Sequence, residues 1–272
     1  MEARKREEIE FHDKLRTGAY EQRWSPAAEA RVESDPLWTN FKYYAVEKES
    51  LDLREQWIRE RSPRARVLDY CCGNGEEAIK VAEFGAASAV GMDISEVSIE
   101  NCREMAAKAG VSDRVTFQAM DAEALGFPDN AFDLIIEYGV LHHLDLDKAM
   151  GELCRVLSPS GAFIGTETLA HNPLIRRYRR RTPELRTAWE AEHILGRPQF
   201  QLISRYFERV DMVFFHLATL AAVPFRRTPF FPYLLAPLRL IDRLILKIPG
   251  LKWHAWQVLF IATGPRKQPR GR

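Results

Sequence analysis

The sequence has few cysteines, no long apolar run and almost no net charge. None of its four cysteines belongs to a CxxC pair or to a zinc-ligand spacing; they are Cys71, Cys72, Cys102 and Cys154. We therefore expect a reduced protein without a disulfide framework. The longest apolar stretch, 212–225, contains His216 and Pro224 and is shorter than the ~20 residues that a membrane span needs. The N-terminus lacks the apolar core of a secretory signal, so we expect a cytoplasmic protein.

The net charge of +1 hides an uneven distribution. Residues 1–165 carry 20 basic and 31 acidic side chains, a net charge of −11, whereas residues 166–272 carry 19 basic and 7 acidic side chains, a net charge of +12. With 46% hydrophobic and 28% charged residues, the chain is neither disordered nor fibrous. The asymmetry predicts a charged ligand or surface for at least one half.

Short apolar runs alternate with amphipathic segments from Arg66 onward. Helical periodicity marks 76–84, 96–109 and 147–157, with Ser95 placed to cap the second helix. The runs that predict strands are 65–70, 87–93, 114–120, 132–138, 162–168, 209–219 and 256–264. This alternation predicts an α/β protein with a Rossmann-like, mostly parallel seven-stranded sheet and helices on both faces.

Three segments lie outside this alternation. Residues 1–16 alternate in charge sign and predict a solvated helix. Residues 38–61 mix aromatic and charged side chains at helical spacing and predict a helix that packs along one face. An insertion rich in Pro, Phe and Leu, 220–256, precedes the last strand.

A glycine-rich turn follows the first predicted strand. The strand ends at Asp69, and Gly73-x-Gly75-x-x-Ala78 comes next, with Asp93 twenty residues beyond Gly73. Such a turn lets the backbone approach a ligand at a helix N-terminus. This spacing also fits a dinucleotide fingerprint, so a nicotinamide-dependent oxidoreductase is one alternative.

Further residues separate the alternatives. Asp121 closes the third strand, and the runs FDLIIEYGVLHHL and ELCRVLSPSGAF follow in order. With the glycine turn, they make residues 64–168 resemble the class I S-adenosylmethionine-dependent methyltransferases, whose first motif reads VLDxGCGTG. The sequence departs from that pattern at Cys71, where glycine is usual, and at Ser160 in the common PGG turn. Cys71 is small, so we expect it to narrow the loop without abolishing binding.

The resemblance implies a site for S-adenosyl-L-methionine. Asp69 would lie near the amino group of the cofactor, Asp93 would accept hydrogen bonds from the ribose hydroxyls, and Asp121 would accept one from the adenine amino group. The full implied cofactor set is Asp69, Cys71, Gly73, Asn74, Gly75, Asp93, Ile94, Asp121, Ala122 and Glu137. It also implies a domain at 64–268, with a cofactor-binding half at 64–168 and an acceptor half at 169–257. Residues 1–63 would form a helical extension that covers the site.

Methyl transfer to a hydroxyl or ammonium group needs alignment and the loss of a proton. Alignment alone can lower the activation barrier by ~7–11 kcal/mol, and a nearby base can accept the proton. The candidates beside the methyl group are His142, His143, Glu137 and Tyr138, with His12 on the N-terminal helix as a further base. No metal site is expected.

The basic half indicates the nature of the acceptor. The Arg176–Arg181 cluster contains five arginines, too many for one helix face, and 238–248 predicts a basic amphipathic helix. The insertion 220–256 is either a peripheral contact with an anionic membrane or a lid over a greasy substrate. We expect methyl transfer to a small apolar or amphipathic acceptor that is lipid-, quinone- or natural-product-like. We do not expect a nucleic-acid partner. The remaining alternative is a fold that binds the cofactor for other chemistry or serves as a membrane- or RNA-binding module.

Overall fold

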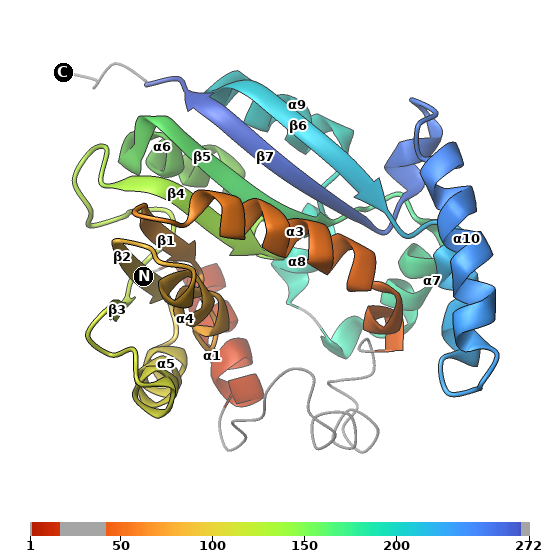
Figure 1. Ribbon diagram of the computed structural model, residues 1–272, viewed down its shortest axis with the longest axis horizontal. Helices are drawn as coiled ribbons and strands as arrows, with labels where there is room; N and C mark the ends of the chain where they lie inside the picture. Colours follow the sequence, from red (N-terminus) through yellow and green to blue (C-terminus); the bar gives the residue numbers. More distant parts are fainter. Residues whose placement is uncertain (1, 17–41, 186, 268–272) are drawn as a thin grey trace.

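A seven-stranded sheet forms the centre of the computed structural model, which describes residues 2–16, 42–185 and 187–267 (Figure 1). The strand order is β3-β2-β1-β4-β5-β7-β6; β7 runs antiparallel to β5 and β6, and the other pairs are parallel. The strands are β1 (Arg66–Tyr70), β2 (Ser88–Asp93), β3 (Val115–Ala119), β4 (Phe132–Tyr138), β5 (Leu157–Thr168), β6 (Phe207–Phe215) and β7 (Gln257–Pro265). The predicted mostly parallel, Rossmann-like sheet is confirmed.

Helices cover both faces of the sheet, as predicted. One core contains α3 (Lys48–Arg61), α4 (Glu76–Glu83) and α5 (Glu96–Ala109). The opposite core contains α6 (Leu146–Val156) and α9 (Arg197–Tyr206). Successive strand residues point to opposite faces, so Val67 packs in the first core and Leu68 in the second. Parallel strands buried on both faces direct their carboxyl ends to one edge, where ligands bind in open α/β sheets.

The helices begin and end at residues with a local reason to be there. The Ser95 hydroxyl accepts a hydrogen bond from the Ser98 N–H at 3.0 Å and caps α5, and Gly110 ends that helix with a φ of 69°. Asp145 caps α6 in the same way, through the Lys148 N–H. These caps fix where each helix starts relative to the strand before it.

The N-terminal segments differ from the prediction. Helix α1 (Ala3–Arg16) is present, but Lys5 and Glu8 are buried, so the prediction of a solvated helix is wrong. Its long side chains cross to the carboxyl edge of the sheet. Helix α3 begins at Lys48 rather than at 38; residues 42–46 form a 3-10 turn, and 38–41 lie outside the described residues.

The acceptor half adds short elements beside the antiparallel strands: α7 (Pro173–Arg181), η3 (Pro183–Leu185), α8 (Ala188–His193), η4 (Thr219–Phe225), α10 (Phe231–Ile245) and η5 (Leu251–His254). The last three form the predicted insertion between β6 and β7. No described helix is long and apolar enough to cross a bilayer.

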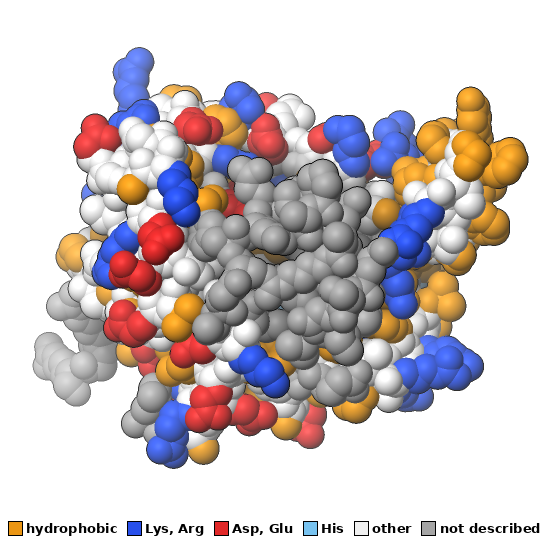
Figure 2. Space-filling model, turned by 90° about the horizontal axis from the view of Figure 1, so that it is seen from below, with side chains coloured by type: hydrophobic (Ala, Val, Ile, Leu, Met, Phe, Trp, Pro, Cys, Tyr) orange, Lys and Arg blue, Asp and Glu red, His pale blue; other side chains and the backbone are white. Residues whose placement is uncertain are grey.

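Helix α10 packs on the protein through Leu235 and Asp242 and leaves other apolar side chains exposed. Asp242 is buried and accepts hydrogen bonds from the N–H groups of Leu217, Ala218 and Thr219. Arg243 pairs with Glu49 of α3 at 2.7 Å. Exposed apolar side chains follow one another along η4, α10 and their flanks: Phe225, Phe230, Tyr233, Leu234, Leu240, Ile241, Leu244 and Ile248. Figure 2 shows hydrophobic side chains gathered at one end of the molecule, with basic side chains beside them.

Candidate functional site

A cavity of about 1000 Å³ opens at the carboxyl edge of the sheet. It lies between the loops that follow β1, β2 and β4 on one side and α1 on the other. The sequence-predicted residues that line it are Asp69, Cys71, Gly73, Asn74, Asp93, Ile94, Asp121, Ala122, Tyr138, His142 and His143, together with His12. Gly75 and Glu137 do not line it. The structure therefore brings most of the predicted residues into one chamber.

The loop after β1 has an unusual backbone. Cys71, Gly73 and Gly75 all have positive φ values, of 55°, 57° and 79°. A β-carbon on Gly75 would lie 2.7 Å from the Phe117 ring and 2.9 Å from Cys102 Sγ, so Gly75 permits close packing beneath the loop. Cys71 adopts the left-handed conformation despite its side chain, which explains why glycine is usual there. The loop thus keeps its turn without the first glycine.

Asp69 belongs to β1 and lies at the base of the cavity, next to the N-terminus of α4. It is buried and accepts a hydrogen bond from the Ala78 N–H at 3.0 Å. Burial raises the pKa of Asp69 to about 7, and the nearby Glu77 carboxylate adds to the rise. Burial also favours protonation of Glu77, but the buried Arg54 guanidinium 2.5 Å away lowers its pKa to about 2. Asp69 is therefore the carboxyl group here that titrates near neutrality and gains most from a cationic neighbour.

The carboxylates at the ends of β2 and β3 contact cations of α1. Asp93 accepts the Gly73 and Ser95 N–H groups at 3.1 and 3.0 Å, and Arg16 approaches it at 3.4 Å. The Arg16 guanidinium also lies over Gly73, 3.5 Å from the position of an added β-carbon. Asp121 pairs with Lys5 at 2.7 Å. Two positive charges of α1 therefore lie where the sequence predicts ribose and adenine.

Each histidine after β4 is held by a carboxylate. His142 Nδ1 lies 2.7 Å from Glu167 Oε2, and its Nε2 faces Glu190 at 3.9 Å. His143 Nδ1 lies 3.0 Å from Glu8 Oε2 of α1. Burial opposes the charged form of His143, but the hydrogen bond to Glu8 and the negative charges of Glu190, Glu8 and Glu167 together outweigh it and raise the pKa of His143. A carboxylate at Nδ1 fixes the ring orientation and leaves Nε2 for other chemistry.

Glu137 and Tyr138 differ in their relation to the cavity. Glu137 is fully buried, does not line the cavity and accepts the Val140 N–H at 3.2 Å. Burial and the neighbouring Glu167 raise its pKa well above the usual range. Tyr138 does line the cavity, and its hydroxyl donates to Glu47 at 2.8 Å.

The end of the cavity near α7 is aromatic. Tyr43, Tyr44, Tyr178 and Trp256 line it, with Tyr43 packed against both Tyr178 and Trp256. Arg179 of the arginine cluster also lines the cavity and donates to Thr168 Oγ1 at 2.9 Å, whereas the other four arginines are exposed. No residue of α10 lines the cavity in this structure, whereas Trp256, at the end of the predicted insertion 220–256, does.

Sequence reasoning named His12 of α1 but missed Lys5, Glu8 and Arg16 of the same helix, and Glu167. Glu8 and His12 are four residues apart in EEIEFHD, a spacing that puts them on one helix face, and this was the available signal. No local signal pointed to Lys5 and Arg16, because their partners lie 116 and 77 residues away in the sequence. Glu167 lies one residue before the end of β5, which pairs with β4, and only this strand order brings it to His142.

The fold and the cavity define a class. A mostly parallel sheet presents a glycine-rich loop and carboxylates at the ends of adjacent strands, an arrangement that belongs to α/β proteins that bind a nucleotide-like cofactor. Residues 61–217 match a family described as a methyltransferase domain, more than half of the chain. The chain belongs to this methyltransferase-domain family.

Comparison with known proteins gives relatives by sequence and by structure. The chain is 41% identical over 97 residues to a 27-O-demethylrifamycin SV methyltransferase of Amycolatopsis mediterranei, covering 35% of this chain and 36% of that protein. It is 34% identical over 110 residues to a demethylmenaquinone methyltransferase of Bacteroides fragilis, covering 40% and 44%. The chain thus spans less than half the length of these curated relatives. A geranyl diphosphate C-methyltransferase from Streptomyces coelicolor has a similar structure, with a TM-score of 0.61, 12% identity and coverage of 97% and 99%.

Proposed function

We propose that this protein transfers a methyl group from S-adenosyl-L-methionine to a small apolar or amphipathic acceptor. The observation that carries the proposal is a single cavity with the glycine-rich loop and carboxylates at one end and an aromatic wall at the other. A cavity of about 1000 Å³ is at the upper end of the usual range for ligand pockets, with room for a cofactor and an acceptor.

The cofactor end fits that ligand residue by residue. Asp93 would accept hydrogen bonds from the ribose hydroxyls, and Asp121 with the Ala122 N–H would face the adenine. Both carboxylates now contact α1, so binding requires Arg16 and Lys5 to release them. Gly73 has a positive φ and no side chain. Its backbone therefore leaves room for the bound cofactor, where a side chain would intrude.

The chain's own residues then align the acceptor and remove its proton. When bound, S-adenosyl-L-methionine would supply an electrophilic methyl group. The Tyr43, Tyr178 and Trp256 rings would hold an apolar acceptor, and Arg179 would face an anionic group on it. His142, oriented by Glu167, is the proposed proton acceptor for a hydroxyl group, because Nδ1 is held and Nε2 is left for the cavity.

The exposed apolar side of α10 supports a peripheral contact with an anionic membrane. Leu240 and Leu244, on consecutive turns of α10, are 60% and 61% exposed, and Ile248 just beyond the helix is 52% exposed, a pattern typical of interfacial helices. The exposed arginines of α7 supply positive charge in the same half of the chain, which would favour anionic lipid. Trp256 and Leu235 share one small core, so α10 and the aromatic end of the cavity are neighbours. An apolar acceptor would then enter from the lipid.

Two measurements test the methyl-transfer proposal. We expect S-adenosylhomocysteine to bind with 1:1 stoichiometry in calorimetry, and reduced nicotinamide dinucleotide to give no fluorescence change on titration. Release of S-adenosylhomocysteine would then be followed with hydroxylated quinols, sterols and polyketide phenols as acceptors. Absence of S-adenosylhomocysteine binding by the folded protein would refute the proposal.

A pH dependence of cofactor binding follows from Asp69. Its folded pKa of about 7 lies above the usual 3.8, so the group is mostly protonated below pH 7 and ionises above it. A cofactor ammonium beside it would favour the charged form and release a proton. We expect affinity for S-adenosylhomocysteine to rise between pH 5.5 and pH 8, with a buffer-dependent enthalpy at pH 6 that reports this proton. In Asp69→Asn both effects are expected to vanish; their persistence there would contradict the assignment.

A further inference from the structure

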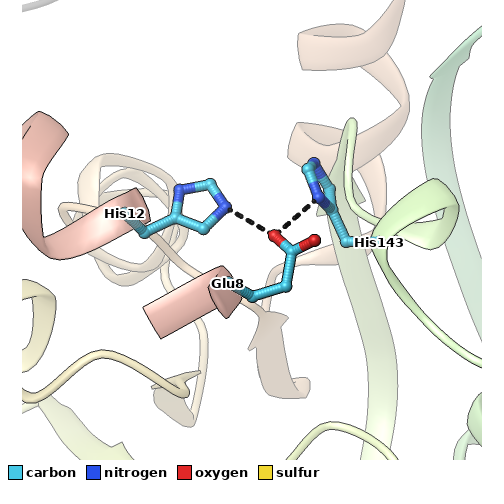
Figure 3. Close-up of side chains that lie close together, drawn as sticks. All are labelled: Glu8, His12 and His143. Atoms are coloured by element: carbon cyan, nitrogen blue, oxygen red, sulfur yellow. Dashed lines mark hydrogen bonds and ion pairs between the residues drawn. The ribbon is translucent and has the colours of Figure 1, made fainter. Parts of the chain in front are cut away.

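We propose that Glu8, His12 and His143 form a binding site for a divalent transition-metal ion in the wall of the cavity. The three side chains come from α1 and from the turn after β4, and Figure 3 shows both imidazole rings directed at the Glu8 carboxylate. Their ligand atoms all lie within 4.8 Å of one another. Two imidazole nitrogens and one carboxylate oxygen are a ligand set that zinc and similar ions use at catalytic sites.

The spacing of the ligand atoms fits such an ion. Bonds of ~2.0–2.2 Å in a tetrahedral arrangement place neighbouring ligand atoms ~3.4 Å apart. Glu8 Oε2 lies 3.0 Å from His143 Nδ1 and 3.5 Å from His12 Nε2, values on either side of that figure. An ion could therefore enter with small movements of three side chains.

A second layer already orients the carboxylate. The Thr187 hydroxyl donates to Glu8 Oε1 at 2.5 Å, which leaves Oε2 directed at the two rings. Groups of this kind fix ligand geometry around metal ions.

The three ligands leave one side of the site to the cavity. Glu8, His12 and His143 all line it, so a fourth ligand would come from the cavity, as water or as an oxygen atom of the acceptor. Three protein ligands and one open position are the pattern of catalytic rather than structural zinc sites. The involvement of an acceptor oxygen rests on the proposed methyl transfer, whereas metal binding itself does not.

Titration of the metal-free protein with Co²⁺ tests the site directly. We expect one equivalent to bind with a visible ligand-field spectrum, and Zn²⁺ to displace it. His12→Ala and Glu8→Gln are each expected to weaken binding by more than ~100-fold, because each removes a ligand or its charge. His254→Ala changes an exposed histidine outside the cavity and is expected to leave binding unchanged.

One further variant separates two arrangements that share His143. His142, His143 and Glu190 also lie close enough to hold an ion. Binding that survives in His142→Ala and is lost in His12→Ala supports the proposed site, and the reverse pattern overturns it. Absence of one-equivalent Co²⁺ binding also overturns it and leaves Glu8 with a hydrogen-bonding role alone. S-adenosylhomocysteine binding, measured on every variant, reports folding and tests the methyl-transfer proposal separately.

Discussion

Asp93→Ala is expected to weaken the binding of S-adenosylhomocysteine by about 150-fold or more. The carboxylate would accept two hydrogen bonds from ribose hydroxyls, and hydrogen bonds to charged groups contribute about 1.5–3 kcal/mol each. It also holds the Gly73 and Ser95 N–H groups, so its loss would loosen the loop that the ligand lies on. Calorimetric titration of the purified variant against the wild-type protein measures the change.

Two variants make this result interpretable. Asp113→Ala removes a carboxylate with an 81% exposed side chain in the loop before β3 and is expected to bind like the wild type. Asp93→Asn keeps the shape and one acceptor oxygen, so its affinity is expected to lie between those of the wild type and Asp93→Ala. Unchanged binding in Asp93→Ala, with the fold intact by circular dichroism, would remove Asp93 from the cofactor site.

The sheet and the cofactor loop could be predicted because their signals are local. Each strand is a short apolar run that ends in a polar turn, and Ser95 and Gly110 mark the ends of α5 within a few residues. The positions of Asp69, Asp93 and Asp121 at three strand ends follow from that pattern alone, since parallel strands share one carboxyl edge.

What the sequence did not reveal depends on contacts between distant residues. Alternating charges in α1 are typical of a solvated helix, yet Lys5 and Glu8 are buried because their partners, Asp121 and His143, are supplied by other elements. Likewise, α10 faces inward at Asp242, a charged residue, because its carboxylate accepts hydrogen bonds from three backbone N–H groups in residues 217–219. Periodicity separates two faces of a helix, but such partners decide which face turns inward.

Replacing Leu240 and Leu244 together by Ser is expected to reduce binding to phospholipid vesicles by about 20- to 400-fold. Each fully buried Leu contributes about 1.5–3 kcal/mol of transfer free energy, and both side chains are about three-fifths exposed in the free protein. For the same reason their removal costs the fold little, so the unfolding midpoint is expected to stay within a few degrees. Vesicle flotation with and without phosphatidylglycerol measures the partition, and unaltered flotation would exclude α10 from the interface.

The charged part of this contact can be separated from the apolar part. Arg177→Ala with Arg180→Ala is expected to lower binding to phosphatidylglycerol vesicles by about 30-fold, since each basic side chain near an anionic surface contributes ~1 kcal/mol. Neutral vesicles and high salt would abolish that difference but leave the effect of the leucine substitutions. Arg103→Ala with Lys108→Ala removes two exposed charges from α5, in the other half of the chain, and serves as the control. If both double variants lose vesicle binding equally, net charge alone attracts the protein to the membrane, and the arginines of α7 make no specific contact with it.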